Sequence, residues 1–141
     1  ALKPMTFMNE SGRAAGEAAR FYKLGPDAVV AFHDELDLAP GKVRVKTGGG
    51  AAGHNGLRSL DAHLGAGYRR VRIGIGHPGH KDKVLGHVLH DFSRDDALWL
   101  EPVLEAIAEA VPDLIRGEDA NFMNRVALRV QEHAARTGEA R

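Results

Sequence analysis

A glycine-rich loop followed by a histidine and an asparagine is the stretch of this sequence best suited to chemistry. Residues 47–56 read TGGGAAGHNG and include three consecutive glycines at positions 48–50. Each glycine costs backbone entropy that a side chain would reduce, so we infer that a ligand comes close to the backbone here. Successive N–H groups in such a loop can bind an anion, and a helix expected over residues 56–64 would point its N-terminus at the same place. The loop therefore predicts a phosphate site, although a solvated flexible loop explains the glycines alone equally well.

A second set of polar residues could act on an ester. Its members are Asn9, Asp34, His54 and Asn55. Asp34 follows an apolar run, AVVAF, that we expect to be a buried strand, and ligands of open α/β sheets gather at the carboxyl ends of strands. A histidine base held by a carboxylate, with amides that place a carbonyl and a water, suits water attack on an activated ester. The plainer interpretations are that Asn9 or Ser11 caps a helix and that Asp34 lies in a solvated acidic turn.

Two expected strands carry alternating basic residues toward glycine-rich segments. In residues 42–47 the basic side chains are Lys42, Arg44 and Lys46, and in residues 68–76 Arg70 and Arg72 share one face. Such a stripe is usually only a solvated surface. Because both stripes end beside glycines, they also suit a bound phosphate group.

The composition excludes several other kinds of site. The chain has no cysteine, so it has no disulfide, thiolate nucleophile or Cys-ligated metal. Its eight histidines lack the spacing of a zinc site, and no G-x-S-x-G motif is present. With 19 basic and 19 acidic side chains, any contact with nucleic acid must come from local clusters. No apolar run approaches the ~18 residues that span a bilayer and no secretory signal is visible, so we expect a soluble cytoplasmic protein.

The remaining patterns predict the elements that position these residues. We expect the end of a strand over residues 2–7, a helix over 11–23, a strand edge near His87 and His90, a helix that begins at Ser93 and is kinked or interrupted by Pro102 and Pro112, and a last helix over 119–132. Gly117 should end the long helix. The predicted organisation is one α/β domain over residues 1–133 followed by a flexible tail over 134–141.

Four stretches of the chain resemble the bacterial-type peptidyl-tRNA hydrolases. They are KPMTFMNESG at residues 3–12, HDELDLAPG at 33–41, KTGGGAAGHNGLRS at 46–59 and RVRIGIGHPGHKDKV at 70–84. The resemblance implies a twisted, mostly parallel mixed sheet between helices. It also implies hydrolysis of the ester between peptide and tRNA, which recycles tRNA from aborted translation, by a protein that is monomeric when full length and needs no metal or organic cofactor.

The resemblance also implies roles for individual residues. Asn9 would hydrogen-bond the substrate near the ester and the attacking water, with Phe7 and Met8 beside it in the pocket. Asp34 would orient a base histidine, and His54 and Asn55 would hold the peptide and the 3′ end of the tRNA. Lys46 and Arg72 would clamp the 5′-phosphate of the acceptor stem.

Two departures from the family pattern bear on activity. Ala51 and Ala52 stand where the family more often has His-Gly, a change that we expect to be tolerated. Family members also carry about sixty residues ahead of the position of Lys3, which hold a first strand, an asparagine and the base histidine. We therefore expect a chain that is incomplete at its N-terminus and inactive alone. The alternatives are a non-catalytic RNA-binding relative of the kind that acts in splicing, or a fragment without function. An upstream Asn-Pro-Gly turn followed by a histidine would indicate the enzyme.

Overall fold

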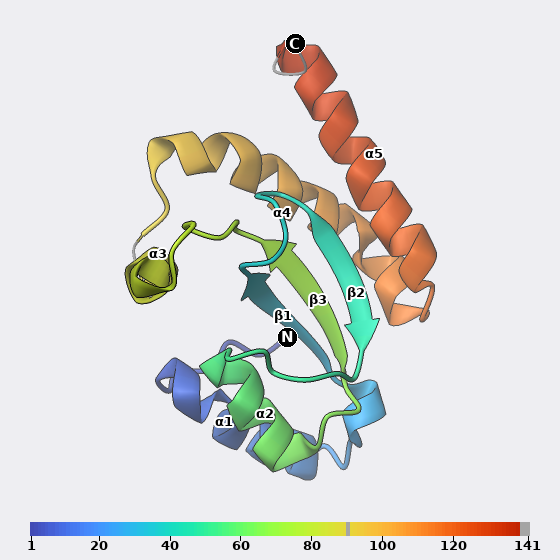
Figure 1. Ribbon diagram of the computed structural model, residues 1–141. Helices are drawn as coiled ribbons and strands as arrows, with labels where there is room; N and C mark the ends of the chain where they lie inside the picture. The colour runs from blue at the N-terminus through green and yellow to red at the C-terminus, as the bar shows by residue number, and fades with distance from the viewer. Residues whose placement is uncertain (90, 139–141) are drawn as a thin grey trace. The chain divides into compact units, whose positions relative to one another are not determined.

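The computed structural model describes residues 1–89 and 91–138, and within these it forms α-helices and a three-stranded sheet (Figure 1). The helices are α1 (Ser11–Phe21), α2 (Asn55–Leu64), α3 (Val84–Leu89), α4 (Arg94–Ile115) and α5 (Asp119–Thr137). The strands are β1 (Val30–Glu35), β2 (Val43–Thr47) and β3 (Arg69–Gly74). The predicted α/β class is confirmed.

The sheet is mixed, with β3 between β1 and β2. The amide of Arg69 donates to Val29 and that of Ile75 donates to Glu35, so β1 and β3 run parallel. The amide of Gly48 donates to Tyr68, whereas Gly74 and Lys42 pair at the other end, so β2 and β3 run antiparallel. Among the described strands one pair is therefore parallel and one antiparallel, rather than mostly parallel. Asp34 lies one residue before the end of β1, as expected.

The chain divides into two compact units. One comprises Ala1–Phe32 with Lys46–Val71, and the other comprises His33–Val45 with Arg72–Arg141. The expectation of one domain over residues 1–133 stays a prediction, as does the expectation that helices cover both faces of the sheet.

In the first unit, α1 packs against α2 (Figure 1), and Gly12 lies at their contact. The amide of Gly12 donates to Ser59 Oγ at 2.8 Å, and both residues are buried. A Cβ added to Gly12 would lie 1.9 Å from the carbonyl oxygen of Ser59. Glycine at this position therefore lets the backbones of the two helices approach closely.

In the second unit, α4 and α5 form a hairpin whose apolar stripes face each other. Ser93 and Asp96 make the predicted capping box, and Gly117 follows the helix with a positive φ of 76°. The sequence predicted that the two prolines kink or interrupt this helix. The interruption is wrong, because Arg94–Ile115 is one helix that contains both prolines. Val103, Ile107 and Leu114 form a buried apolar stripe along the helix. This burial stabilises the helix although the two prolines have no N–H to donate.

Three other expectations need correction. Residues 2–7 form no strand, since no described strand pairs with them and Pro4 lacks an N–H donor. The apolar segment near His87 is helix α3 rather than a strand edge, and the His87 ring lies 2.8 Å from the carbonyl oxygen of Gly76. His90 lies outside the described residues. Residues 134–137 belong to α5, so this part of the expected tail is helical, and residues 139–141 lie outside the described part.

We predict that Gly12→Ala destabilises the first unit by about 3 kcal/mol, because the new methyl group would overlap the backbone of Ser59 and force the helices apart. Gly16→Ala in the same helix is the matched control. Its Cβ would lie 3.2 Å from the Arg20 guanidinium, 3.3 Å from the Cβ of His63 and 3.8 Å from the carbonyl oxygen of His63, with no contact as short as that at Gly12. Chemical denaturation of both variants measures the difference, and equal stabilities would contradict the close approach of α1 and α2.

Candidate functional site

The glycine-rich loop adopts a backbone that explains its composition. Gly48, Gly49 and Gly53 have φ angles of 69°, 97° and 83°, in the left-handed region where glycine has no steric penalty. Ala52 also has a positive φ, 48°, which costs an ordinary residue roughly 1 to 2 kcal/mol. The loop therefore holds a strained shape that its neighbours must maintain.

Arg70 holds the loop in this shape through hydrogen bonds from the protein interior. Its guanidinium donates to the carbonyl oxygens of Gly50 at 2.7 Å and Gly49 at 2.8 Å, and it pairs with Asp61 at 3.1 Å. The residue is only 2% exposed. The prediction that Arg70 forms an exposed basic stripe with Arg72 is therefore wrong. The two terminal nitrogens of this buried guanidinium donate to the loop and to α2, whereas its Nε has no hydrogen-bond partner among the described residues.

His54 caps α2 and so stands at the junction of loop and helix. Its Nδ1 accepts a hydrogen bond from the amide of Leu57 at 3.2 Å, which is the pattern of an N-cap. A neutral ring that accepts at Nδ1 carries its proton on Nε2. The helix predicted from residue 56 is confirmed and begins at Asn55, whose side chain is exposed.

Phe7, Met8 and Asn9 lie at a turn of 3₁₀ helix in the same unit. A Cβ added to Gly56 would lie 3.1 Å from Met8 Cγ and 2.9 Å from His54 Cε1, so Met8 and His54 meet across this glycine. Phe7 is 83% exposed and Asn9 is also exposed. The cap interpretations of Asn9 and Ser11 are wrong, because the N-cap residue of α1 is Glu10 and Ser11 Oγ donates to the carbonyl of Met8.

Lys46 reaches the glycine-rich loop from the end of β2. A Cβ added to Gly49 would lie 2.9 Å from Lys46 Nζ, so the ammonium group lies over the Gly49 backbone. Lys42, Arg44 and Lys46 are exposed, whereas Val43 between them is buried, as the alternation predicted. The first basic stripe therefore does lead into the loop.

Asp34 and Arg72 belong to the second unit. Arg72 donates through Nε to Glu35 Oε1 at 2.9 Å, and its second nitrogen lies 2.9 Å from the same oxygen. The side chains are 27% and 15% exposed, so this pair is only partly shielded from solvent. Arg72 is consequently a neutralised cation rather than an isolated one.

The structure thus brings together Met8, Lys46, His54 and the loop within one unit, and places Asp34 and Arg72 in the other. Among the described residues, no group of three or more His, Asp or Glu side chains could hold a metal ion. None of the described helices is long and apolar enough to cross a membrane.

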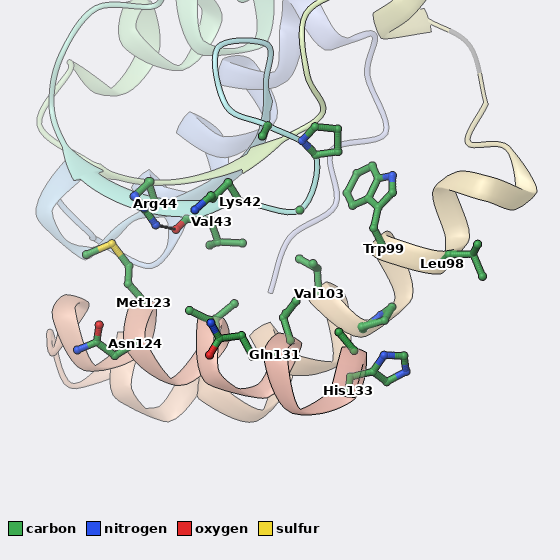
Figure 2. A pocket seen from close by; sticks show the side chains of 18 of the residues that line it. Lys42, Val43, Arg44, Leu98, Trp99, Val103, Met123, Asn124, Gln131 and His133 are labelled. Atoms are coloured by element: carbon green, nitrogen blue, oxygen red, sulfur yellow. Dashed lines mark hydrogen bonds between the residues drawn. The ribbon is translucent and has the colours of Figure 1, made fainter. Parts of the chain in front are cut away.

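The second unit also contains an apolar groove of about 900 Å³ (Figure 2). It is lined by Lys42 just before β2, by Val43 and Arg44 on β2, by Trp99 and Val103 on α4, and by Met123, Gln131 and His133 on α5. The Val45 amide lies 3.4 Å from Met123 Sδ, which joins β2 to α5 beside the groove. None of the residues proposed above for ester chemistry lines this groove.

Two residues that the sequence reasoning missed complete the surroundings of Arg70. Tyr68 is fully buried, and its hydroxyl donates to Asp61 Oδ1 at 2.7 Å while the Arg70 guanidinium stacks 4.7 Å from the ring centre. Burial, and next the hydrogen bond to Asp61, raise the pKa of Tyr68 far above its ordinary value, so the phenol stays protonated and donates. An aromatic residue two positions before Arg70, on the same strand face, was the available signal.

Comparison with known proteins gives a consistent family match. The peptidyl-tRNA hydrolase family matches residues 1–135. The chain is 68% identical over 128 residues to a peptidyl-tRNA hydrolase of Parvibaculum lavamentivorans, covering 90% of this chain and 62% of the relative, and 62% identical to that of Dinoroseobacter shibae, covering 91% and 54%. A crystal structure of the Acinetobacter baumannii peptidyl-tRNA hydrolase superposes with a TM-score of 0.80 at 42% identity, covering 87% of this chain and 63% of that one. The chain thus spans less than two thirds of the length of each of these proteins.

We predict that His54→Asn and His54→Ala differ in stability, because only asparagine can replace the helix cap. Asparagine is a good N-cap, so His54→Asn should keep the thermal stability, whereas His54→Ala should lose about 1 kcal/mol. Thermal melts of both variants test the cap. If His54→Ala is as stable as the wild type, the hydrogen bond to Leu57 contributes nothing to the helix.

Proposed function

Because this chain belongs to the peptidyl-tRNA hydrolase family, we propose that its function is to hydrolyse the ester between a peptide and tRNA, which recycles tRNA from aborted translation. The observation that carries the proposal is the glycine-rich loop, which joins a left-handed backbone, an overlying Lys46 ammonium and a capping His54 within one unit. The relatives named above are all hydrolases, which favours this function over a non-catalytic RNA-binding role.

The chemistry is attack of water on the carbonyl carbon of the ester, with the tRNA 3′ oxygen as leaving group. Asn9 is exposed and forms no hydrogen bond with another described residue through its side chain, so its amide is available to the substrate carbonyl and the water. His54 and Asn55 hold the peptide and the 3′ end, beside Phe7 and Met8. Asp34, at the end of β1, holds the base histidine in the tautomer that accepts the proton of water.

We propose further that the general base is none of the described histidines whose rings contact the main chain. Most of the described histidines have a ring nitrogen within hydrogen-bond distance of a main-chain atom, as at His33, His54, His63, His77, His80 and His87. These rings serve local structure.

The hydrolysis assay uses N-acetyl-aminoacyl-tRNA with residues 1–141 alone and with the upstream segment of a relative fused ahead of residue 1. We predict no turnover above background for the first protein and turnover for the second, since a positioned base contributes about 10² to 10⁴ in rate.

In the fused protein Asp34→Ala should remove most of the rate. Asn9→Asp should lower it about 10²-fold, at unchanged melting temperature because the site is exposed. Turnover by residues 1–141 alone would make His54 the first candidate base.

Phosphate recognition is tested with an acceptor-stem RNA that carries or lacks a 5′-phosphate. Lys46→Ala combined with Arg72→Ala should weaken binding of the phosphorylated RNA and reduce its salt dependence by about 0.7 to 0.9 log units per lost phosphate contact. RNA without the phosphate should respond little. Exposed Lys42→Ala with Arg44→Ala on the same basic stripe is the control. Equal losses for both RNAs would mean that Lys46 and Arg72 act only as general surface charge.

A further inference from the structure

We propose that Arg70 is a positioning residue that directs the N–H groups of the glycine-rich loop toward the substrate. The inference rests on the proposed function for the identity of that substrate. Arg70 itself is buried and contacts the protein interior, so it acts through the loop rather than by touching the ligand.

The planarity of the peptide group gives the first step. In a trans peptide the carbonyl of one residue and the N–H of the next point in opposite directions. The carbonyl oxygens of Gly49 and Gly50 both point at the Arg70 guanidinium, at 2.8 and 2.7 Å. The N–H groups of Gly50 and Ala51 therefore point away from Arg70.

These N–H groups are also unengaged within the part of the chain that the structure describes. At the start of the loop the Gly48 amide donates to the carbonyl oxygen of Tyr68. At its end the His54 amide donates to the carbonyl oxygen of Ala51. The amides of Gly50 and Ala51 have no acceptor between these two points. Two adjacent donors held in one direction suit an acceptor oxygen of the peptidyl 3′ end, next to His54 and Asn55.

The supports of Arg70 explain why it holds the loop firmly. Asp61 on α2 binds the same guanidinium and also accepts from Tyr68, whose ring lies under the cation. The guanidinium therefore links three parts of one unit: the loop, α2 and the start of β3. A lysine at this position would supply the charge without the planar set of donors that reaches two carbonyls and a carboxylate together.

The test compares three variants of the full 141-residue chain. Asp61→Asn with Arg70→Met removes the buried charge of Arg70 together with the charge of its partly exposed partner, so neither is left uncompensated and folding is retained. Arg70→Lys keeps the charge and removes the planar fork. Tyr68→Phe removes only the hydroxyl that contacts Asp61, and it serves as the control for lost stability without a change at the loop.

Amide hydrogen exchange at Gly48 and His54, whose N–H groups are hydrogen-bonded at the two ends of the loop, is the first readout and is measured well below every melting midpoint. We expect exchange in both Arg70 variants to be at least about tenfold faster than in the wild type, while Tyr68→Phe lowers the melting temperature and leaves the loop unchanged. The second readout is affinity for an amide analogue of a 3′-peptidyl-adenosine. Affinity should fall about tenfold if the competent loop conformation falls tenfold in population, and Tyr68→Phe should bind as the wild type does.

Each outcome decides a separate question. Wild-type loop exchange in both Arg70 variants would overturn the positioning role and leave Arg70 as a core ion pair. Faster exchange with unchanged affinity would also overturn it, because the loop shape would then not matter for the ligand. A wild-type chain that fails to bind the analogue, yet shows the expected exchange pattern, would refute the proposed substrate while Arg70 still positions the loop.

Discussion

A guanidinium that is almost fully removed from water must find a negative partner and acceptors for its donors, and in this protein that requirement falls on Arg70. Its acceptors come from two segments that the chain reaches separately, the loop after β2 and the middle of α2, and the Tyr68 ring before β3 packs against the cation. The loop cannot take another shape without leaving these donors unpaired. The strained φ of Ala52 and the left-handed glycines persist because this arrangement over-determines them.

Periodicity predicted those parts of the fold that depend on local rules. The alternation around Val43, the capping box at Ser93 and the end of α4 before Gly117 follow from side-chain direction and helix-end chemistry, and all three are present. Arg70 was misassigned because alternation gives the face of a strand but not what covers that face. Its partner Asp61 lies nine positions away on a helix, at a distance that only tertiary packing sets. Likewise, an apolar run as short as Val84–Leu89 fits a strand or a helix equally well.

The predicted site residues differ in how far local structure accounts for them. His54 has a structural duty that the motif did not reveal, since its ring begins α2 as well as facing the region of Met8. Asn9 is exposed and is not the N-cap residue of α1, and its contact with the substrate stays a proposal. The family match extends over residues 1–135, yet the roles of these residues still rest on the motifs, because the chain covers only part of each longer relative.

For the phosphate-binding role proposed for Arg72, its pairing with Glu35 has a consequence for discrimination between kinds of phosphate. Because Arg72 is already paired with the Glu35 carboxylate, another anion can bind it only by displacing that carboxylate. The incoming anion must therefore bind Arg72 more tightly than a group of charge −1 does. A phosphodiester inside an RNA strand carries a single charge, whereas a terminal phosphomonoester carries about −1.5 to −2 at neutral pH. In that proposal Glu35 favours exchange with a terminal 5′-phosphate over exchange with the phosphodiesters inside a strand.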